Sequence, residues 1–268
     1  LATLLNTPRP LSFGKDGSST HSRDGDPIAA ALAANLPGAF RVRKISVLTD
    51  AEIIAANPKP LFLPKYFTPY PFQMSATFPM PNLPRDNPLT VERVALGKKL
   101  FFDRRLSINN EQSCADCHSP AKAFTDGRKV ARGAEGDFGP RNTMPLLNLA
   151  WKNQFFWDGR ASSPREQVLQ PIKNPIEMHQ ALTDLVVKLG QTNDNYSALF
   201  CTAFGTPEIT AEKISLALEN YLLTLTSFDA KFDRVLRGRE KFTAEEQRGF
   251  ELFSTEYDPR RGQYGADC

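Results

Sequence analysis

Long apolar runs are missing from this chain of 268 residues. No stretch approaches the roughly 18 consecutive apolar residues that a membrane-spanning helix needs, so we expect no membrane span. The first residues, Leu1 to Leu5, also lack the basic start and the longer apolar stretch of a secretory signal. We interpret this as a signal that has been removed or a sequence that starts after it.

Blocks of one charge sign are missing as well. Lys and Arg never form a run longer than two residues, and the net charge is only +3. A nucleic-acid partner is therefore not indicated. Hydrophobic residues make up 41% and charged residues 24% of the chain, which is ordinary globular usage, so we expect a packed core.

Cysteine and histidine are scarce, with four and three residues respectively. They are too few and too unevenly placed for a disulfide framework. Two of the cysteines and one histidine nevertheless fall within five residues, in the string Cys114-Ala115-Asp116-Cys117-His118. This clustering makes the pentapeptide the first candidate for a functional site.

The spacing of this pentapeptide is typical of covalent haem attachment. Cys114 and Cys117 lie one helical turn apart and can add to the two vinyl groups, and His118 is then held under the iron as a ligand. A thioredoxin-like motif would need a βαβ context, which the sequence does not indicate. A structural zinc site would need a second pair of ligands, and Cys201, His179 and His21 are too scattered to supply one. Haem c also implies an oxidising compartment, most often the bacterial periplasm.

Proline and aromatic residues are concentrated together between positions 57 and 88. This stretch holds nine prolines, which exclude a regular helix or a central strand. A disordered linker is normally poor in aromatics. We therefore predict an extended arm docked on the body, with a flexible linker as the alternative. The aromatic residues are Phe62, Tyr66, Phe67, Tyr70, Phe72 and Phe78.

Helical patterns dominate from Thr90 onward. Thr90 and Thr210 precede amphipathic stretches as N-caps, and Thr183 is expected to cap a helix that stops at Gly190. Thr243 and Glu246 form a capping box before a Leu/Phe-rich helix. No alternating strand pattern is evident. The fold class is predicted to be all-α, with long ordered loops such as the one from Gly127 to Gly139.

The last residue, Cys268, follows the Leu/Phe-rich stretch Phe250–Phe253, much as Cys114 follows Leu100–Phe102. We infer that Cys268 is the first cysteine of a second haem motif, which is cut there. A terminal free cysteine is the alternative, although exposed free thiols are usually avoided in secreted proteins.

Further strings share their order and spacing with a known family. They are Asn87–Thr90, Leu96–Asp103, Leu106–Ser107, Ser113–His118, Phe124–Gly127, Arg141–Thr143, Phe156–Ala161, Glu166–Gln167, Pro171–Ile172, Asn174–Pro175, Glu177–Met178, Ala203–Gly205, Leu223–Leu225 and Gly249–Phe253. Over roughly residues 85–268 the chain resembles the bacterial di-haem cytochrome c peroxidase and MauG-like superfamily. This resemblance predicts that the chain has three parts. They are an N-terminal extension with the arm (1–84), a peroxide-reacting cytochrome c domain (85–240) and the start of a second, truncated cytochrome c domain (241–268).

The resemblance implies roles for several residues, and it also shows departures. His118 would bind the peroxide-reacting iron, a second haem would admit electrons, and a calcium ion would lie between the two haems. The family usually has Gln where this chain has Phe155, and Leu-Glu where it has Pro164-Arg165. That Glu is the expected acid/base for peroxide, so the site would be a variant one.

Candidate residues for the chemistry follow from the resemblance and from side-chain type. Arg165 would stabilise the departing hydroxide and Glu166 would act as base, with a solvated helix start as the alternative. Arg141 and Arg160 are candidates for the haem propionates, and Asn142 for the calcium. Trp157 is a candidate electron relay, as is Trp151, with core packing as the alternative. The candidates for a sixth iron ligand are Met144, Met178 and His179.

These observations favour a periplasmic di-haem peroxidase that reduces hydrogen peroxide with electrons from a small cytochrome or cupredoxin. One alternative is a MauG-like enzyme that oxidises a partner protein. Another is a non-catalytic electron-transfer cytochrome with a closed iron. The sequence does not fix the oligomeric state, and a homodimer stays among the alternatives.

Overall fold

The computed structural model describes residues 62–76, 78–192 and 194–266, and these form a mainly helical chain. The α-helices are α3 (Val91–Phe101), α4 (Cys114–Cys117), α5 (Pro164–Lys173), α6 (Leu182–Gly190), α7 (Tyr196–Phe204), α8 (Ala211–Leu223), α9 (Lys231–Leu236) and α10 (Ala244–Ser254). Short 3-10 turns cover Arg104–Leu106, Pro120–Lys122, Leu149–Trp151 and Pro259–Arg261. Strand β1 (Tyr257–Asp258) pairs antiparallel with β2 (Gln263–Tyr264). The predicted all-α class is confirmed, with this small sheet as an addition.

Side-chain caps begin three of the predicted helices. The hydroxyl of Thr90 accepts from the backbone N–H of Arg93 at 3.2 Å, and that of Thr210 accepts from Lys213 at 3.1 Å. Thr243 starts α10 with the predicted capping box. The prediction for Thr183 is wrong, because α6 begins at Leu182 and Ala181 is its N-cap, but the helix does end at Gly190.

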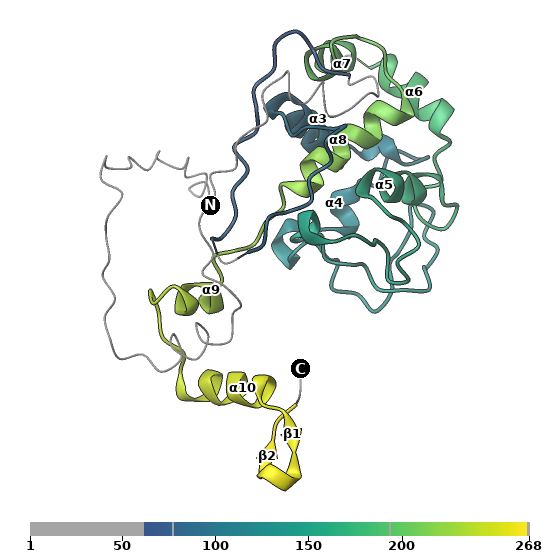
Figure 1. Cartoon of the computed structure of the whole chain (residues 1–268). Coiled ribbons are helices and arrows are strands. Elements are labelled where there is room, and N and C mark those ends of the chain that lie inside the picture. The colour runs from purple at the N-terminus through teal and green to yellow at the C-terminus, as the bar shows by residue number, and fades with distance from the viewer. Residues whose placement is uncertain (1–61, 77, 193, 267–268) are drawn as a thin grey trace, which may run out of the picture.

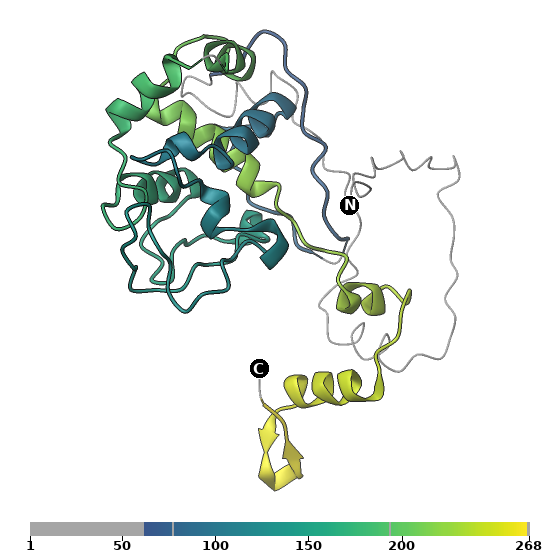
Figure 2. The ribbon, with the colours of Figure 1, turned by 180° about the vertical axis from the view of Figure 1, so that it is seen from behind.

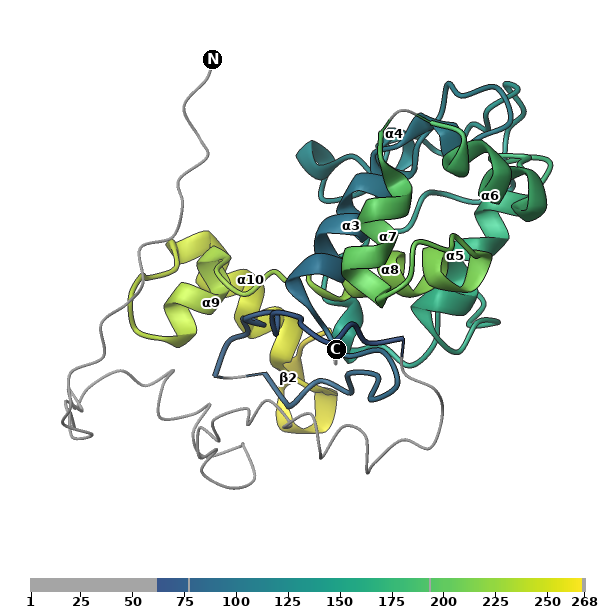
Figure 3. The ribbon, with the colours of Figure 1, turned by 90° about the horizontal axis from the view of Figure 1, so that it is seen from above.

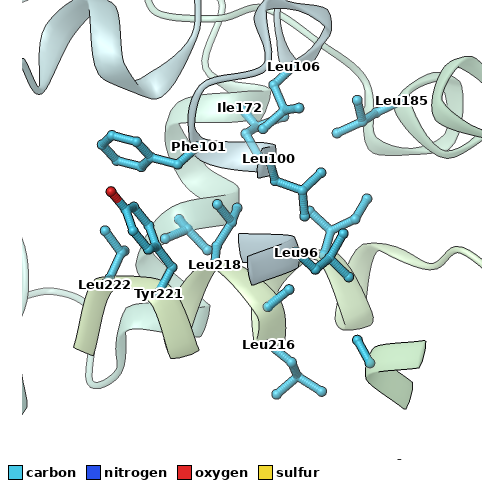
Figure 4. Close-up of a cluster of buried hydrophobic side chains, with 14 of the residues drawn as sticks. Leu96, Leu100, Phe101, Leu106, Ile172, Leu185, Leu216, Leu218, Tyr221 and Leu222 are labelled. Atoms are coloured by element: carbon cyan, nitrogen blue, oxygen red, sulfur yellow. The ribbon is translucent and has the colours of Figure 1, made fainter. Parts of the chain in front are cut away.

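Helices α3 and α8 cross at the centre of the body, and α5, α6 and α7 surround them (Figure 1). At the crossing, Gly97 lies against the backbone of Ala217, so close that a Cβ on Gly97 would be 1.9 Å from the Ala217 carbonyl oxygen. The two helices can therefore approach only because residue 97 has no side chain. Figure 4 shows the buried side chains around this contact, among them Leu96, Leu100, Phe101, Leu106, Ile172, Leu185, Leu216, Leu218, Tyr221 and Leu222.

A buried arginine ties α3 to its neighbours. Arg93 is fully buried and donates to Asn87 Oδ1 at 2.8 Å, to the Ala203 carbonyl at 3.1 Å and to the Phe62 carbonyl. Its guanidinium also lies over the ring of Phe204, 4.6 Å from the ring centre. Burial lowers the pKa of Arg93 to about 10, and the nearby positive charge of Arg165 acts in the same direction. The side chain still carries its charge at neutral pH, which is why every donor needs a partner.

Residues 62–76 and 78–90 form an irregular segment before α3 (Figures 1 and 3). The backbone N–H of Tyr70 donates to the Leu89 carbonyl at 3.0 Å. The indole N–H of Trp151 donates to the Pro79 carbonyl at 2.7 Å, and its ring packs against Phe72 and Phe78. These contacts agree with a packing role for Trp151, which was the alternative to its role as an electron relay. Of the predicted extension, residues 1–61 lie outside the described part of the chain.

The elements after residue 230 lie apart from the body in Figures 1 and 2. Phe232, Phe242 and Phe250 pack together with ring centres 5.7–6.0 Å apart. None of the residues of α10 is buried. Nowhere in the described ranges is a helix long and apolar enough to cross a bilayer. Cys268 falls outside these ranges.

Candidate haem site

The two thiols of the Cys-x-x-Cys-His string lie on the short helix α4. Asp116 fixes the start of this helix, because its Oδ2 accepts from the backbone N–H of Ser113 at 2.8 Å and from the Ser113 hydroxyl at 2.7 Å. Arg104 pairs with the other oxygen of Asp116 at 3.1 Å. The helical turn between Cys114 and Cys117 thereby has the form that the sequence predicts for haem attachment.

His118 ends α4 and is oriented by the turn that follows. Ala123 and Phe124 both have a positive φ, of 53° and 60°. This left-handed pair brings the Phe124 carbonyl to 3.0 Å from His118 Nδ1. A carbonyl only accepts, so Nδ1 carries the proton and the lone pair of Nε2 is left for a metal.

The environment of His118 favours this neutral form. Burial lowers the pKa of the imidazole below its ordinary value, although hydrogen bonds with the backbone of Phe124 and Met144 act in the opposite sense. A neutral imidazole is the form that binds iron. Burial also raises the pKa of the Cys114 thiol to about 12, with a smaller contribution from neighbouring Cys117.

A cavity of about 500 Å³ opens beside α4, which is within the usual size range of cofactor pockets. Its walls come from α4, the Gly-rich loop, the segment around Phe156, α5 with the turn after it, and α8. Most of the lining is apolar. Residues of the lining include Phe101, Leu146, Leu149, Phe155, Phe156, Pro164, Val168, Ile176, Met144, Met178, Leu218 and Leu222.

The polar groups of this lining fit a haem. Gln112 Oε1 and Thr143 Oγ1 are buried and have no hydrogen-bond partner within the described part of the chain, and both residues line the cavity. Apolar walls with two thiols, one histidine and unpaired polar atoms suit a flat apolar ring with polar edges. Among residues 62–76, 78–192 and 194–266, no group of three or more His, Cys, Asp and Glu side chains is placed to hold a metal ion.

The two predicted propionate-binding arginines meet at this cavity. Arg141 and Arg160 both pair with Asp158, at 2.7 and 2.9 Å, and all three residues line the cavity. The guanidinium of Arg160 also stacks on Phe156, 3.4 Å from the ring centre. The hydrogen bond from Arg141, followed by that from Arg160, lowers the pKa of Asp158 to about 2. The arrangement gathers positive charge at the cavity, while the contact with propionates stays a prediction.

Trp157 and Asn142 lie side by side in the lining. The indole N–H of Trp157 donates to the Asn142 carbonyl at 2.9 Å, and 57% of Trp157 is exposed. This exposure argues against a core-packing role for the ring. The side-chain amide of Asn142 donates to the Arg128 carbonyl. The predicted relay and calcium roles of these two residues are not tested by these contacts.

Arg165 and Glu166, predicted to act on peroxide, are not part of the cavity lining. Arg165 donates two hydrogen bonds to Asp86, at 2.7 and 2.8 Å, and one to Glu219 at 2.9 Å. Glu166 accepts from the backbone N–H and the hydroxyl of Ser162, at 2.8 and 3.0 Å, in the first turn of α5. Both side chains have structural partners, and their catalytic assignment stays a prediction that these contacts do not support.

Several polar residues of the cavity were given no role from the sequence, among them Gln154, Gln167 and Glu177. The string Glu177-Met178 stands out in the sequence only through the family resemblance, and it carries no local signal of a role. Among the candidate sixth ligands, Met144 and Met178 line the cavity, and Met178 is buried. His179 instead pairs with Glu135 at the surface, where both side chains are more than 40% exposed.

The pentapeptide, the oriented histidine and the adjoining cavity together fit a c-type haem. Residues 91–241 match the family described as di-haem cytochrome c peroxidase. The methylamine utilization protein MauG of Methylorubrum extorquens is 46% identical over 64% of this chain and 49% of its own length. The cytochrome c peroxidase Ccp of Escherichia coli is 34% identical over 65% of this chain and 38% of its own length. The chain therefore belongs to the di-haem cytochrome c peroxidase family, and its cofactor class is haem c.

Solved structures agree with this assignment. A MauG-like protein associated with microbial copper homeostasis superposes with a TM-score of 0.65 and 32% sequence identity, over 68% of this chain and 54% of the other. The chain spans about half the length of the curated relatives it matches.

Proposed function

We propose that this chain is the peroxide-reacting part of a di-haem peroxidase, which reduces hydrogen peroxide with electrons from a small cytochrome or cupredoxin. The observation that carries the proposal is that His118, whose Nδ1 lies at the Phe124 carbonyl, lines a large cavity together with Gln154, Gln167, Glu177 and Arg160. An electron carrier needs only a closed iron in an apolar setting. Polar side chains in the cavity favour a reaction that handles protons.

Each residue of the proposed site would have a distinct role in the reaction. Cys114 and Cys117 would hold the haem covalently, and His118 would bind its iron. The bound haem would supply the iron at which peroxide is reduced. Arg141 and Arg160 would orient the propionates through charge-assisted hydrogen bonds. Reduction of one peroxide to two waters takes two electrons and two protons, so proton-binding groups are needed at the cavity.

Several finer features belong to the same proposal. A second haem would be attached through Cys268, a calcium ion would lie near Asn142, and Trp157 would carry electrons between the haems. The protein would work in the periplasm, where c-type haem proteins are usually assembled. A homodimer is compatible with it.

MauG-like oxidation of a partner protein is the second candidate. It is favoured by the 46% and 42% identity to two proteins named MauG, and by the departures at Phe155 and Arg165 from the usual residues of the peroxidases. A pure electron carrier would instead need a second ligand, for which Met144 or Met178 is placed in the lining.

The test is stopped-flow spectroscopy of the full-length, haem-loaded ferric protein with stoichiometric hydrogen peroxide. A rapid shift of the Soret band, reversed by a reduced small cytochrome with loss of peroxide, is the expected result. The protein should be examined both as isolated and half-reduced. A low-spin spectrum that does not respond to peroxide in either state would overturn the peroxidase and leave the electron carrier. A shift that is reversed only by a protein substrate would support the MauG-like activity.

A further inference from the structure

Asp126 follows a tight loop that folds back on His118. Phe124 N–H donates to the Ser119 carbonyl at 2.8 Å, and Ser119 N–H donates to the Thr125 carbonyl at 3.1 Å. Ser119 and Thr125 thereby form an isolated antiparallel bridge. The next residues on the two sides of this bridge are His118 and Asp126, which places them opposite each other. The backbone therefore holds Asp126 close to the side chain that would bind iron.

The carboxyl group of Asp126 is buried, and only one of its oxygens has a partner. The side chain is in a residue that is 6% exposed, and its Oδ1 accepts from the backbone N–H of Arg128 at 3.0 Å. Oδ2 has no hydrogen-bond partner within the described part of the chain. The ammonium group of Lys122 donates to the backbone carbonyl of Asp126 at 2.7 Å. A buried carboxylate with an unpaired oxygen costs folding free energy, so its presence here calls for an explanation.

The charge of Asp126 acts on the side chains that would hold the haem. Burial lowers the pKa of His118, and the negative charge of Asp126 acts in the opposite direction. Burial also raises the pKa of the Cys117 thiol, and the same charge adds to that increase. Asp116, another carboxyl group on α4, is instead exposed and pairs with Arg104 at 3.1 Å. Of these two carboxyl groups, only Asp126 is removed from solvent, where a charge is weakly screened.

We propose that the negative charge of Asp126 lowers the reduction potential of the iron bound by His118. The inference rests on the proposed haem site. Asp126 does not line the cavity, so it would act through the electrostatic field and not by contact with peroxide. Ferric haem carries one more positive charge than ferrous haem, so a nearby buried carboxylate favours the ferric form. A low potential suits an iron that passes electrons to peroxide, whereas a carrier with a methionine ligand has a raised potential.

The test is a redox titration of the full-length, haem-loaded protein, followed by its visible spectrum and without peroxide. Asp126→Asn removes the charge but keeps a side-chain oxygen for the Arg128 N–H, so the turn is preserved. The ferric-to-ferrous equilibrium should shift about tenfold toward ferrous iron, which is a rise of about 59 mV for a one-electron couple. Asp126→Ser is a second neutral variant, because its hydroxyl can also accept from the Arg128 N–H. It should raise the potential in the same direction, and it keeps the test decisive if Asp126→Asn does not fold.

Asp116→Asn is the matched control, since it removes an exposed carboxylate that has a charged partner. Its potential should stay close to that of the wild type. A rise as large as that of Asp126→Asn would overturn the proposal, because burial would then not decide the effect. Unchanged potentials in the neutral variants of Asp126 that fold would also overturn it. Because the titration involves no peroxide, either result is separable from a failure of the peroxidase reaction.

Discussion

At the scale of single residues, the positive charge of Arg165 pairs with the buried carboxylate of Glu219. Glu219 on α8 is only 1% exposed, and its Oε2 accepts from both Arg165 and the side chain of Asn87. Asp86 completes the group with two further hydrogen bonds from Arg165. The arginine thereby joins α5, α8 and the segment before α3. A buried carboxylate that loses its charged partner is costly, because no solvent replaces the lost interaction.

We therefore predict that Arg165→Ala lowers the free energy of unfolding by about 3 kcal/mol. Arg104→Ala is the matched control, since it breaks the exposed pair with Asp116 and should cost less than about 1 kcal/mol. Urea unfolding of both variants followed by circular dichroism would measure the difference. If Arg165→Ala kept full stability but lost its reaction with peroxide, the catalytic assignment from the sequence would be right instead.

The same scale shows what the sequence can reveal about a site. Cys114, Cys117 and His118 could be proposed as a haem site from the sequence alone, because the motif is contained in five consecutive residues. Arg165 and Glu166 were harder, since the direction of a side chain in the first turn of a helix depends on distant partners. Glu219, which binds Arg165, is 54 residues away in the chain. The cavity position of Glu177 likewise depends on a contact with the Gly-rich loop that no local pattern indicates.

At the scale of elements, the crossing of α3 and α8 holds the body together. Gly97→Ala would place a methyl group against the backbone of Ala217, which cannot yield without separating the helices. We expect a loss of about 3 kcal/mol in unfolding free energy. Gly190→Ala, at the end of α6 with no atom within 4 Å of the added Cβ, should instead stabilise the protein by about 0.5 kcal/mol.

Thermal unfolding of the two glycine variants would test this difference. Equal melting temperatures for Gly97→Ala and the wild type would mean that α3 and α8 can move apart at no cost.

The helix caps at Thr90, Thr210 and Thr243 were predictable, because a Thr that precedes a helical pattern of apolar residues can be recognised in the local sequence. The hairpin of β1 and β2 was not, since strands of two residues are too short to show an alternating pattern.

At the scale of the whole molecule, the body and the elements after residue 230 differ in burial. Residues Lys213 to Leu223 of α8 are all buried, whereas α10 has no buried residue. Local opening should therefore be much easier in α10. We predict that amide hydrogen exchange in α8 requires global unfolding, at about 5–15 kcal/mol, whereas amides of α10 exchange through local opening at a few kcal/mol. Equal protection of α8 and α10 would contradict this division.

The carbonyl of Phe124 that fixes His118 also has a consequence for assembly. Two left-handed residues, Ala123 and Phe124, set the plane of the imidazole through the polypeptide alone. The ring torsions are thus restricted by the fold, and little rotational freedom would remain to be lost on binding of iron. A ligand aligned in advance of its metal gains affinity without any additional contact to the metal.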